Sequence, residues 1–302
     1  KLDKYPVLSN LDVENQKAGA RVEVDTEKRN PHDFAVWIKA PENHLMKWDS
    51  PWGPSYPGWH IECSVMSQKY LGEVFDIHTG GIDLIPTHHE NEIAQSKGMC
   101  GKIPANYWMH GEFLLINGGK MSKSLGNVYL LQDIVDRGYD PLVYKLFCYS
   151  IQYRKKLNFT WEGMDSAKIA LDRLREAYQK HLTGTEDVAE ELISKYEKDF
   201  NEAINDDLNM PVAMSVVWEV AKRTEKSKKV AELLKKFDRV LGIKIDEHKE
   251  EEIPDDIKEL LTKRVEARKN KDWAESDKIR DIIKEKGYIV KDSKEGQTVE
   301  KC

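Results

Sequence analysis

The sequence lacks several features that would mark a special class of protein. Its four cysteines are far apart and show no paired spacing: Cys63, Cys100, Cys148 and Cys302. This argues against the disulfide framework of a small secreted domain. No run approaches the roughly 18 apolar residues that a membrane span requires, and the first residues show no signal-peptide pattern. We therefore expect a cytoplasmic protein that makes no contact with a membrane.

A large excess of one charge is also absent. The formal net charge of -6 and the pI near 5.9 give no general attraction to phosphate, so any RNA-binding surface must be a local patch. At 302 residues the chain exceeds what one core usually holds, which predicts two or more domains. It opens at Lys1 in a polar, loop-like stretch without an initiating methionine, and we expect that an N-terminal part is missing.

The pattern of elements predicts an α/β region followed by helices. A helix at 60–70, a strand at 75–78, a helix at 88–97 and further alternation at 107–116 are typical of a doubly wound nucleotide-binding sheet. The Pro/Gly/Trp-rich stretch 50–59 is expected to be loop. Apolar spacing of three and four predicts helices at 167–182, 188–205, 211–224, 229–241, 256–269 and 272–286, the last capped by Gly287. The domains expected are 1–55, 56–112, 113–165, 166–248 and 249–302.

The most specific string is Lys120-Met-Ser-Lys123-Ser, which glycines flank on both sides. Mobile ammonium groups that reach a departing pyrophosphate in the transition state lower the barrier to adenylate formation. A solvated basic turn is the plain alternative for such a loop.

A thiolate, an imidazole and a carboxylate form a second group. His88 and Glu92 are four residues apart, which places them on one face of a helix, and Cys63 lies in Gly-Trp-His-Ile-Glu-Cys. These are suitable zinc ligands, although a buried cysteine and a solvated polar helix face would explain the same residues.

Three other groups of residues are candidates for ligand contacts. Trp59 and His60 either wall a pocket or form an aromatic core pair. Gly81 and Asp83 follow a strand, where a glycine permits close backbone approach and a carboxylate accepts hydrogen bonds from a ribose or an ammonium group. The C-terminal helices carry arginines and a tryptophan that suit unpaired bases, or else form a mixed-charge amphipathic helix with the tryptophan in a small core: Arg264, Arg268, Trp273 and Arg280.

These strings, in this order, resemble those of cysteinyl-tRNA synthetases. Residues 120–124 match the KMSKS signature of class I synthetases, and 58–63 and 88–92 are strongly like the zinc-binding strings of the cysteinyl family. The likeness extends over the whole chain, including 28–34 and 205–211.

The resemblance implies a fold and a set of roles. The fold would be the second half of an α/β Rossmann-like class I catalytic core, an all-α helical bundle and a small C-terminal α+β anticodon-binding unit. Lys120 and Lys123 would be catalytic, and Lys123 would contact ATP together with Gly81 and Asp83. Trp59 and His60 would form the substrate pocket. One Zn²⁺ per chain would bind Cys63, His88 and Glu92, with the family's fourth ligand and its HIGH signature upstream of Lys1.

The expected function is ATP-dependent activation of L-cysteine, with Mg²⁺, and transfer of the cysteinyl group to tRNA(Cys) by a monomer. Two alternatives stay open: a related ligase that transfers cysteine to an aminosugar, and a tRNA-binding module without catalysis. The long helical C-terminus argues against the aminosugar ligase. A zinc hydrolase leaves the lysine loop unexplained.

Overall fold

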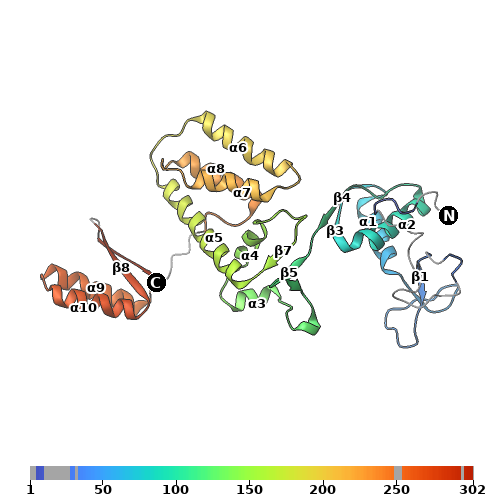
Figure 1. Cartoon of the computed structure of the whole chain (residues 1–302), viewed down its shortest axis with the longest axis horizontal. Coiled ribbons are helices and arrows are strands. Elements are labelled where there is room, and N and C mark those ends of the chain that lie inside the picture. Colours follow the sequence, from blue (N-terminus) through green and yellow to red (C-terminus); the bar gives the residue numbers. More distant parts are fainter. Residues whose placement is uncertain (1–4, 10–27, 31–32, 248–253, 294–295, 302) are drawn as a thin grey trace. The chain divides into compact units, whose positions relative to one another are not determined.

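The computed structural model describes residues 5–9, 28–30, 33–247, 254–293 and 296–301. The chain divides into two compact units, residues 1–246 and residues 247–302. Figure 1 identifies the elements of both units. Among the described residues, no helix combines the length and the apolar character needed to cross a membrane.

The first part of the larger unit contains a βαβ motif. Strand β3 (Phe75–Gly81) pairs in parallel with β4 (Ala105–Gly111), and α2 (Glu90–Cys100) lies between them in the sequence. A 3-10 turn (Ile82–Leu84) and one π-helical turn (Ile85–His89) precede α2, while α1 (Trp59–Leu71) packs against α2. Two parallel strands joined by a helical crossover are the repeating unit of doubly wound sheets.

A short antiparallel pair precedes this motif. Strand β1 (Trp37–Lys39) pairs with β2 (Ser55–Pro57). The expectation that residues 50–59 are entirely loop is therefore wrong for 55–57, and also for Trp59, the first residue of α1. Pro57 is tolerated because it is the last residue of an edge strand in a two-stranded sheet, where no further strand needs its missing N–H as a donor.

A second sheet carries the lysine loop. Strand β5 (Leu114–Ile116) lies between β6 (Gly119–Lys120), which is antiparallel to it, and β7 (Leu157–Phe159), which is parallel to it. The predicted element at 107–116 is thus two strands in two different sheets. Helices α3 (Leu131–Asp136) and α4 (Pro141–Cys148) connect β6 to β7; α4 begins where the Asp140 carboxylate accepts the Leu142 N–H, with a proline at the first helical position.

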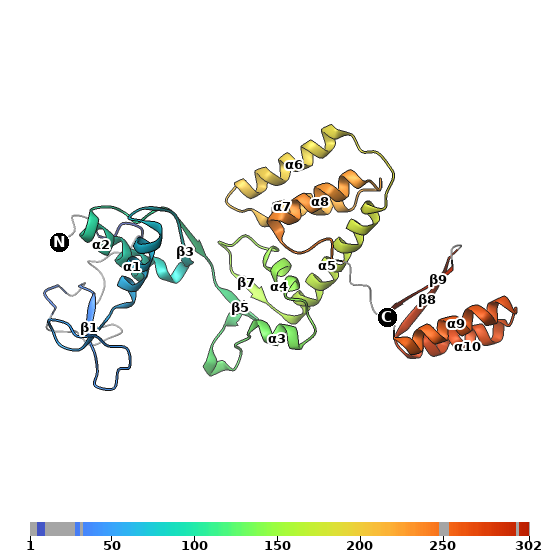
Figure 2. The ribbon, with the colours of Figure 1, turned by 180° about the vertical axis from the view of Figure 1, so that it is seen from behind.

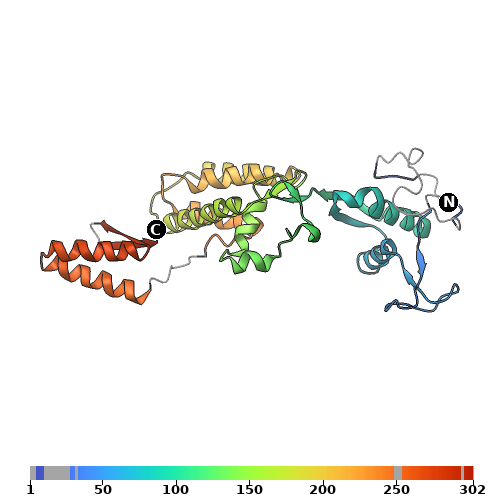
Figure 3. The same cartoon turned by 60° about the horizontal axis from the view of Figure 1, so that its bottom comes forward.

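Four helices follow: α5 (Trp161–Leu182), α6 (Glu190–Asn205), α7 (Met210–Ala221) and α8 (Lys228–Leu241). The ends of α6, α7 and α8 lie within about three residues of the predicted ones, whereas α5 begins at Trp161 and not at the predicted residue 167. In Figures 1 and 3, α6, α7 and α8 lie side by side, and α5 packs along α8. The apolar faces of these helices form one core with β5, α4 and β7, in which Phe200 and Phe237 stack with ring centroids 4.1 Å apart.

Polar contacts join this bundle to the β5–β7 region. The Asp207 carboxylate accepts hydrogen bonds from Arg154 Nε at 2.6 Å and Tyr153 Oη at 2.7 Å, and these bonds hold the pKa of Asp207 at about 2. The ammonium group of Lys145, on α4, donates to the carbonyl of Gly242 at the end of α8. The helical bundle and the sheet that carries the lysine loop therefore form one packed body.

The smaller unit contains a helical hairpin and a β-hairpin. Helices α9 (Asp255–Lys269) and α10 (Trp273–Glu285) pack against each other, and β8 (Tyr288–Ser293) pairs with β9 (Gly296–Lys301) in an antiparallel ladder (Figure 2). Gly287 follows α10 with a φ of 84°, which is the left-handed conformation expected of a glycine after a helix.

Candidate metal and nucleotide site

A cluster of histidines surrounds one buried carboxylate at the βαβ motif. Glu92, on the first turn of α2, is 3% exposed. Histidines from α1, β3, the π-helical turn and β4 surround it, either directly or through one another: His60, His78, His88, His89 and His110. A charged carboxylate at this depth needs partners on both of its oxygens.

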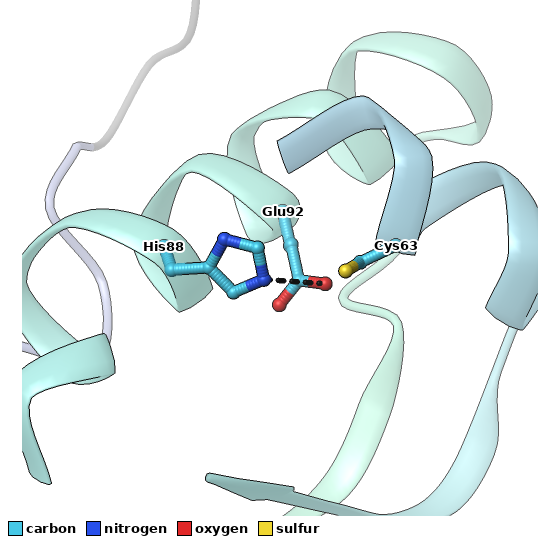
Figure 4. A group of neighbouring side chains, drawn as sticks. All are labelled: Cys63, His88 and Glu92. Atoms are coloured by element: carbon cyan, nitrogen blue, oxygen red, sulfur yellow. Dashed lines mark ion pairs between the residues drawn. The ribbon is translucent and has the colours of Figure 1, made fainter. Parts of the chain in front are cut away.

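One oxygen of Glu92 belongs to the predicted metal group. His88 Nε2 lies 3.6 Å from Glu92 Oε1, and the ligand atoms of Cys63, His88 and Glu92 all lie within 4.8 Å of one another. Figure 4 shows the three side chains pointing toward one another from α1, the π-helical turn and α2. Tetrahedral zinc with its usual bond lengths holds its ligand atoms about 3.5 Å apart, so this group needs only a small contraction to fit the ion.

The surroundings of His88 favour its role as a ligand. His60 Nδ1 lies 2.8 Å from His88 Nδ1, which fixes the ring and leaves Nε2 facing Glu92. An outer partner on the second ring nitrogen is the usual arrangement for a metal-binding histidine. Burial lowers the pKa of His88, so the imidazole is neutral at neutral pH and has a lone pair to donate.

Trp59 lies over this pair rather than in a core. Its ring stacks on His88 with centroids 4.0 Å apart and also on His60, while its side chain is 55% exposed. An aromatic ring that covers a ligand and stays open to solvent on its other side is what a pocket wall requires. The alternative of an aromatic core pair does not describe this residue.

The second oxygen of Glu92 has its own partners, which the sequence analysis did not assign. His78 Nε2 lies 2.8 Å from Glu92 Oε2, and His89 Nε2 lies 4.0 Å from the same oxygen. His89 Nδ1 is 2.8 Å from His110 Nε2. Burial, together with the nearby His78 and His110, lowers the pKa of His89 to about 3, so this buried ring stays neutral. His78, His89 and Glu92 also form a second group with metal-like spacing.

The Cys63 thiol has a raised pKa, which opposes formation of the thiolate that a metal binds. Burial, and then the negative charges of Glu92 and Glu62, raise the pKa of Cys63. A zinc ion would reverse this shift, since it binds the thiolate and replaces the proton. The donor set is therefore suited to zinc and poorly suited to a free reactive thiol.

Glycine at position 80 lets the histidine cluster pack on β3. A Cβ atom there would lie 2.6 Å from His89 Cε1 and 2.8 Å from Leu84 Cδ1, both closer than van der Waals contact allows. Gly81 ends β3, and the Asp83 carboxylate folds back over it from the following turn. The predicted contacts Gly81 and Asp83 thus lie at the carboxyl end of a parallel strand, where doubly wound folds bind ligands.

The lysine loop belongs to the other sheet. Lys120 pairs with Leu115 through β6, and Lys123 starts a short 3-10 turn (Lys123–Leu125). Both lysines are exposed, whereas Met121 packs partly against the core. The two ammonium groups are therefore carried by a loop whose base is fixed.

In the smaller unit the four predicted residues have different environments. Arg264 is 1% exposed; its Nη1 and Nη2 donate to Asp292 at 2.8 and 2.9 Å, and Nη1 also donates to Gln297. Arg268 donates to Asp292 at 2.7 Å, and its guanidinium lies 6.0 Å from the centre of the Trp273 ring. Trp273 and Arg280 are exposed, so the alternative with the tryptophan in a small core does not hold. Asp292, which the sequence analysis did not single out, binds both the buried Arg264 and the half-buried Arg268.

Comparison with known proteins gives the family. The model of the tRNA synthetases class I (C) catalytic domain matches residues 1–169, the DALR domain matches 199–246, and the cysteinyl-tRNA ligase anticodon binding domain matches 250–299. The first match alone covers more than half of the chain. The chain therefore belongs to the class I tRNA synthetases, in their cysteinyl family.

Curated relatives agree along almost the whole chain. Cysteine–tRNA ligase 1 of Burkholderia lata is 43% identical over 98% of this chain and 63% of its own length. The cysteine–tRNA ligases of Treponema denticola and Bacillus cereus are 42% and 43% identical over 96% and 97% of this chain, and 65% and 66% of their own lengths. The chain thus spans slightly less than two thirds of these relatives.

A solved structure supports the fold alone. LeuRS from Agrobacterium radiobacter, solved as the ternary complex LeuRS-tRNA-LeuAMS, matches with a TM-score of 0.50 and 15% identity, over 66% of this chain and 32% of that one. The predicted class I catalytic fold followed by a helical region is confirmed at this coarse level.

Proposed function

We propose that this chain serves as a cysteine–tRNA ligase, which activates L-cysteine with ATP and transfers the cysteinyl group to tRNA(Cys). One observation carries the proposal: the ligand atoms of Cys63, His88 and Glu92 converge within 4.8 Å beside an exposed tryptophan. One zinc ion held there would supply a borderline-soft centre that prefers the sulfur of cysteine to the neutral hydroxyl of serine. Such a preference makes a separate editing site unnecessary.

The residues around this group have roles that follow from their contacts. His78 and His88 approach the two oxygens of Glu92, and His60 holds the ring of His88 in one orientation. Trp59 walls the amino-acid pocket, and His60 lies beside it.

ATP would meet the two other predicted elements. Gly81 allows the adenosine to approach the end of β3, and the Asp83 carboxylate accepts hydrogen bonds from a ribose hydroxyl or from the substrate ammonium group. Lys123, supported by Lys120, donates to the phosphates, which Mg²⁺ also neutralises.

The chemistry consists of two balanced substitutions. A carboxylate oxygen of cysteine attacks the α-phosphorus of ATP, the bond from that phosphorus to the bridging oxygen breaks, and pyrophosphate leaves with the electron pair. A ribose hydroxyl at the tRNA end then attacks the cysteinyl carbonyl, loses its proton and displaces AMP. The lysines act in the first step, where negative charge collects on the departing pyrophosphate.

The smaller unit would bind the anticodon. Trp273 and Arg280 are exposed on α10, Arg268 on α9 is half-buried, and the three offer guanidinium and ring faces to unpaired bases. We propose that Arg264 acts through Asp292, which it orients, since its own guanidinium is buried. We further propose that the protein works as a cytoplasmic monomer.

Cysteine-dependent exchange of labelled pyrophosphate into ATP tests this function. We expect exchange with cysteine and almost none with serine, and we expect Lys123→Ala to slow it by about 100-fold or more, since it removes a charge that acts in the transition state. Lys198→Ala, on the exposed face of α6, is the matched control. Equal exchange with serine, or full activity of Lys123→Ala, would reject the assignment.

A further inference from the structure

The loop that carries Lys120 and Lys123 is closed into a ring by one side chain. The carboxamide of Asn127 accepts a hydrogen bond from the Ser122 N–H through Oδ1 at 2.8 Å. Its Nδ2 donates to the carbonyl of Lys120 at 3.0 Å. Asn127 thus contacts the backbone on both sides of Met121, between the two lysines.

The geometry of the segment requires this closure. After the short turn at 123–125, Gly126 adopts a φ of 63° and donates its N–H to the carbonyl of Lys123, which reverses the chain and brings Asn127 back to the start of the loop. Leucine at position 125 is 68% exposed and gives the turn no core contact. Asn127 and the partly buried Met121 are therefore the groups that tie the loop to its sheet.

A carboxamide is suited to this position. Its oxygen accepts and its nitrogen donates, so one planar group satisfies a backbone N–H and a backbone carbonyl at once. Alanine offers neither bond. Aspartate keeps the acceptor for the Ser122 N–H but places a second oxygen against the Lys120 carbonyl.

The geometry points to Asn127 as a positioning residue for the reaction, one that holds the backbone of the lysine loop so that Lys120 and Lys123 are delivered to the phosphates in one conformation. This inference rests on the proposed function for its kinetic consequence, whereas the ring itself is a property of the loop. Asn127 does not touch ATP; it acts through the two lysines. Ordering the loop in advance contributes to the rate of the chemical step more than to the binding of ATP.

Hydrogen exchange of the whole chain, followed by NMR on ¹⁵N-labelled protein, tests the ring directly. In Asn127→Ala we expect the Ser122 amide to exchange about tenfold faster, as loss of one hydrogen bond implies, while amides of the α5–α8 core are unchanged. Asn127→Asp should keep Ser122 protected because it keeps the acceptor. Asn201→Ala, on the exposed face of α6, controls for loss of an asparagine. An unchanged Ser122 rate in Asn127→Ala would overturn the inference.

Pyrophosphate exchange then separates positioning from a general structural role. We expect Asn127→Ala to lower kcat about tenfold and to change the KM for ATP by less than about threefold, since the lysines are still present but less often in place. An active chain in which Asn127→Ala keeps its full kcat would overturn the assignment. If the unaltered chain shows no cysteine-dependent exchange, the proposed function fails by itself, and the Ser122 amide still decides whether Asn127 holds the loop.

Discussion

Replacing Arg264 by methionine should destabilise the smaller unit without affecting the larger one. Arg264 is buried between α9 and the β-hairpin, where its guanidinium donates twice to Asp292 and once to Gln297. Methionine keeps an unbranched apolar chain of similar length and removes all three bonds. The neighbouring Lys263, whose side chain is 58% exposed, gives the matched control Lys263→Met.

The magnitude follows from these contacts. Hydrogen bonds between charged groups contribute about 1.5–3 kcal/mol each. The Asp292 side chain is 42% exposed and still accepts a hydrogen bond from Arg268 in the variant, so water largely replaces the lost bonds to its carboxylate. The summed energy of the three hydrogen bonds must therefore be reduced. We therefore expect a loss of about 2 kcal/mol, which is roughly a thirtyfold change in the unfolding equilibrium. A unit of this size has little stability to spare.

Amide hydrogen exchange along α9 and α10 in the full chain measures this loss. The amides that open only with the whole unit should exchange about thirtyfold faster in Arg264→Met, and those of α5 to α8 should keep their rates. Lys263→Met should change the smaller unit by less than about 0.5 kcal/mol. If Arg264→Met also changes the stability of the smaller unit by less than about 0.5 kcal/mol, Arg264 is not a structural residue, and a direct contact with RNA becomes the better explanation.

Two further predictions concern acid stability and the helical core. Hydrogen bonds from Arg264, and then from Arg268, lower the pKa of Asp292 to about 2, below the ordinary value of about 3.9. Their contribution to the stability of the smaller unit is therefore complete above about pH 4 and is lost as the pH falls toward 2. NMR of the α9 and α10 amides between about pH 5 and 2 should follow this loss of stability, and Asp292→Asn should make the stability less dependent on pH. Phe237→Ala should lower the free energy of unfolding by about 3–5 kcal/mol, because it leaves a cavity beside the buried ring of Phe200. Urea denaturation measures this loss, and the control Lys236→Ala, at an exposed residue, should lower the free energy of unfolding by less than about 1 kcal/mol.

Sequence reasoning predicted the elements that local patterns determine. The helices of the bundle bury one apolar face, so their spacing of three and four indicated α6 to α8 to within a few residues. Gly287 was predicted from a rule that concerns only the residues around it. The three predicted metal ligands, Cys63, His88 and Glu92, lie close together, as a shared metal site requires. Their proximity depends on the packing of α1 against α2, which no local pattern determines.

Other features depend on distant parts of the chain and left no local signal. His88 and His89 are both buried at the end of the π-helical turn Ile85–His89, because His88 packs against α1 and His89 packs against β3 and β4. The pairing of His78 with Glu92 requires the β3–α2 packing. The sequence predicts an exposed Arg264 side chain on a charged helix. Arg264 is buried because the β-hairpin, which also carries Asp292, packs over it. The dense histidine content of 60–110 was the one signal that could have indicated the wider cluster.

Cobalt substitution tests the central claim most directly, since Co²⁺ accepts the same ligands as zinc and reports thiolate bonds by their charge-transfer absorption. We predict that the chain takes up about one Co²⁺ with one thiolate signal, that L-cysteine adds a second thiolate signal and L-serine adds none, and that Cys63→Ser removes the first signal. A folded chain whose bound cobalt shows no change with cysteine, or whose signal survives in Cys63→Ser, would contradict the account.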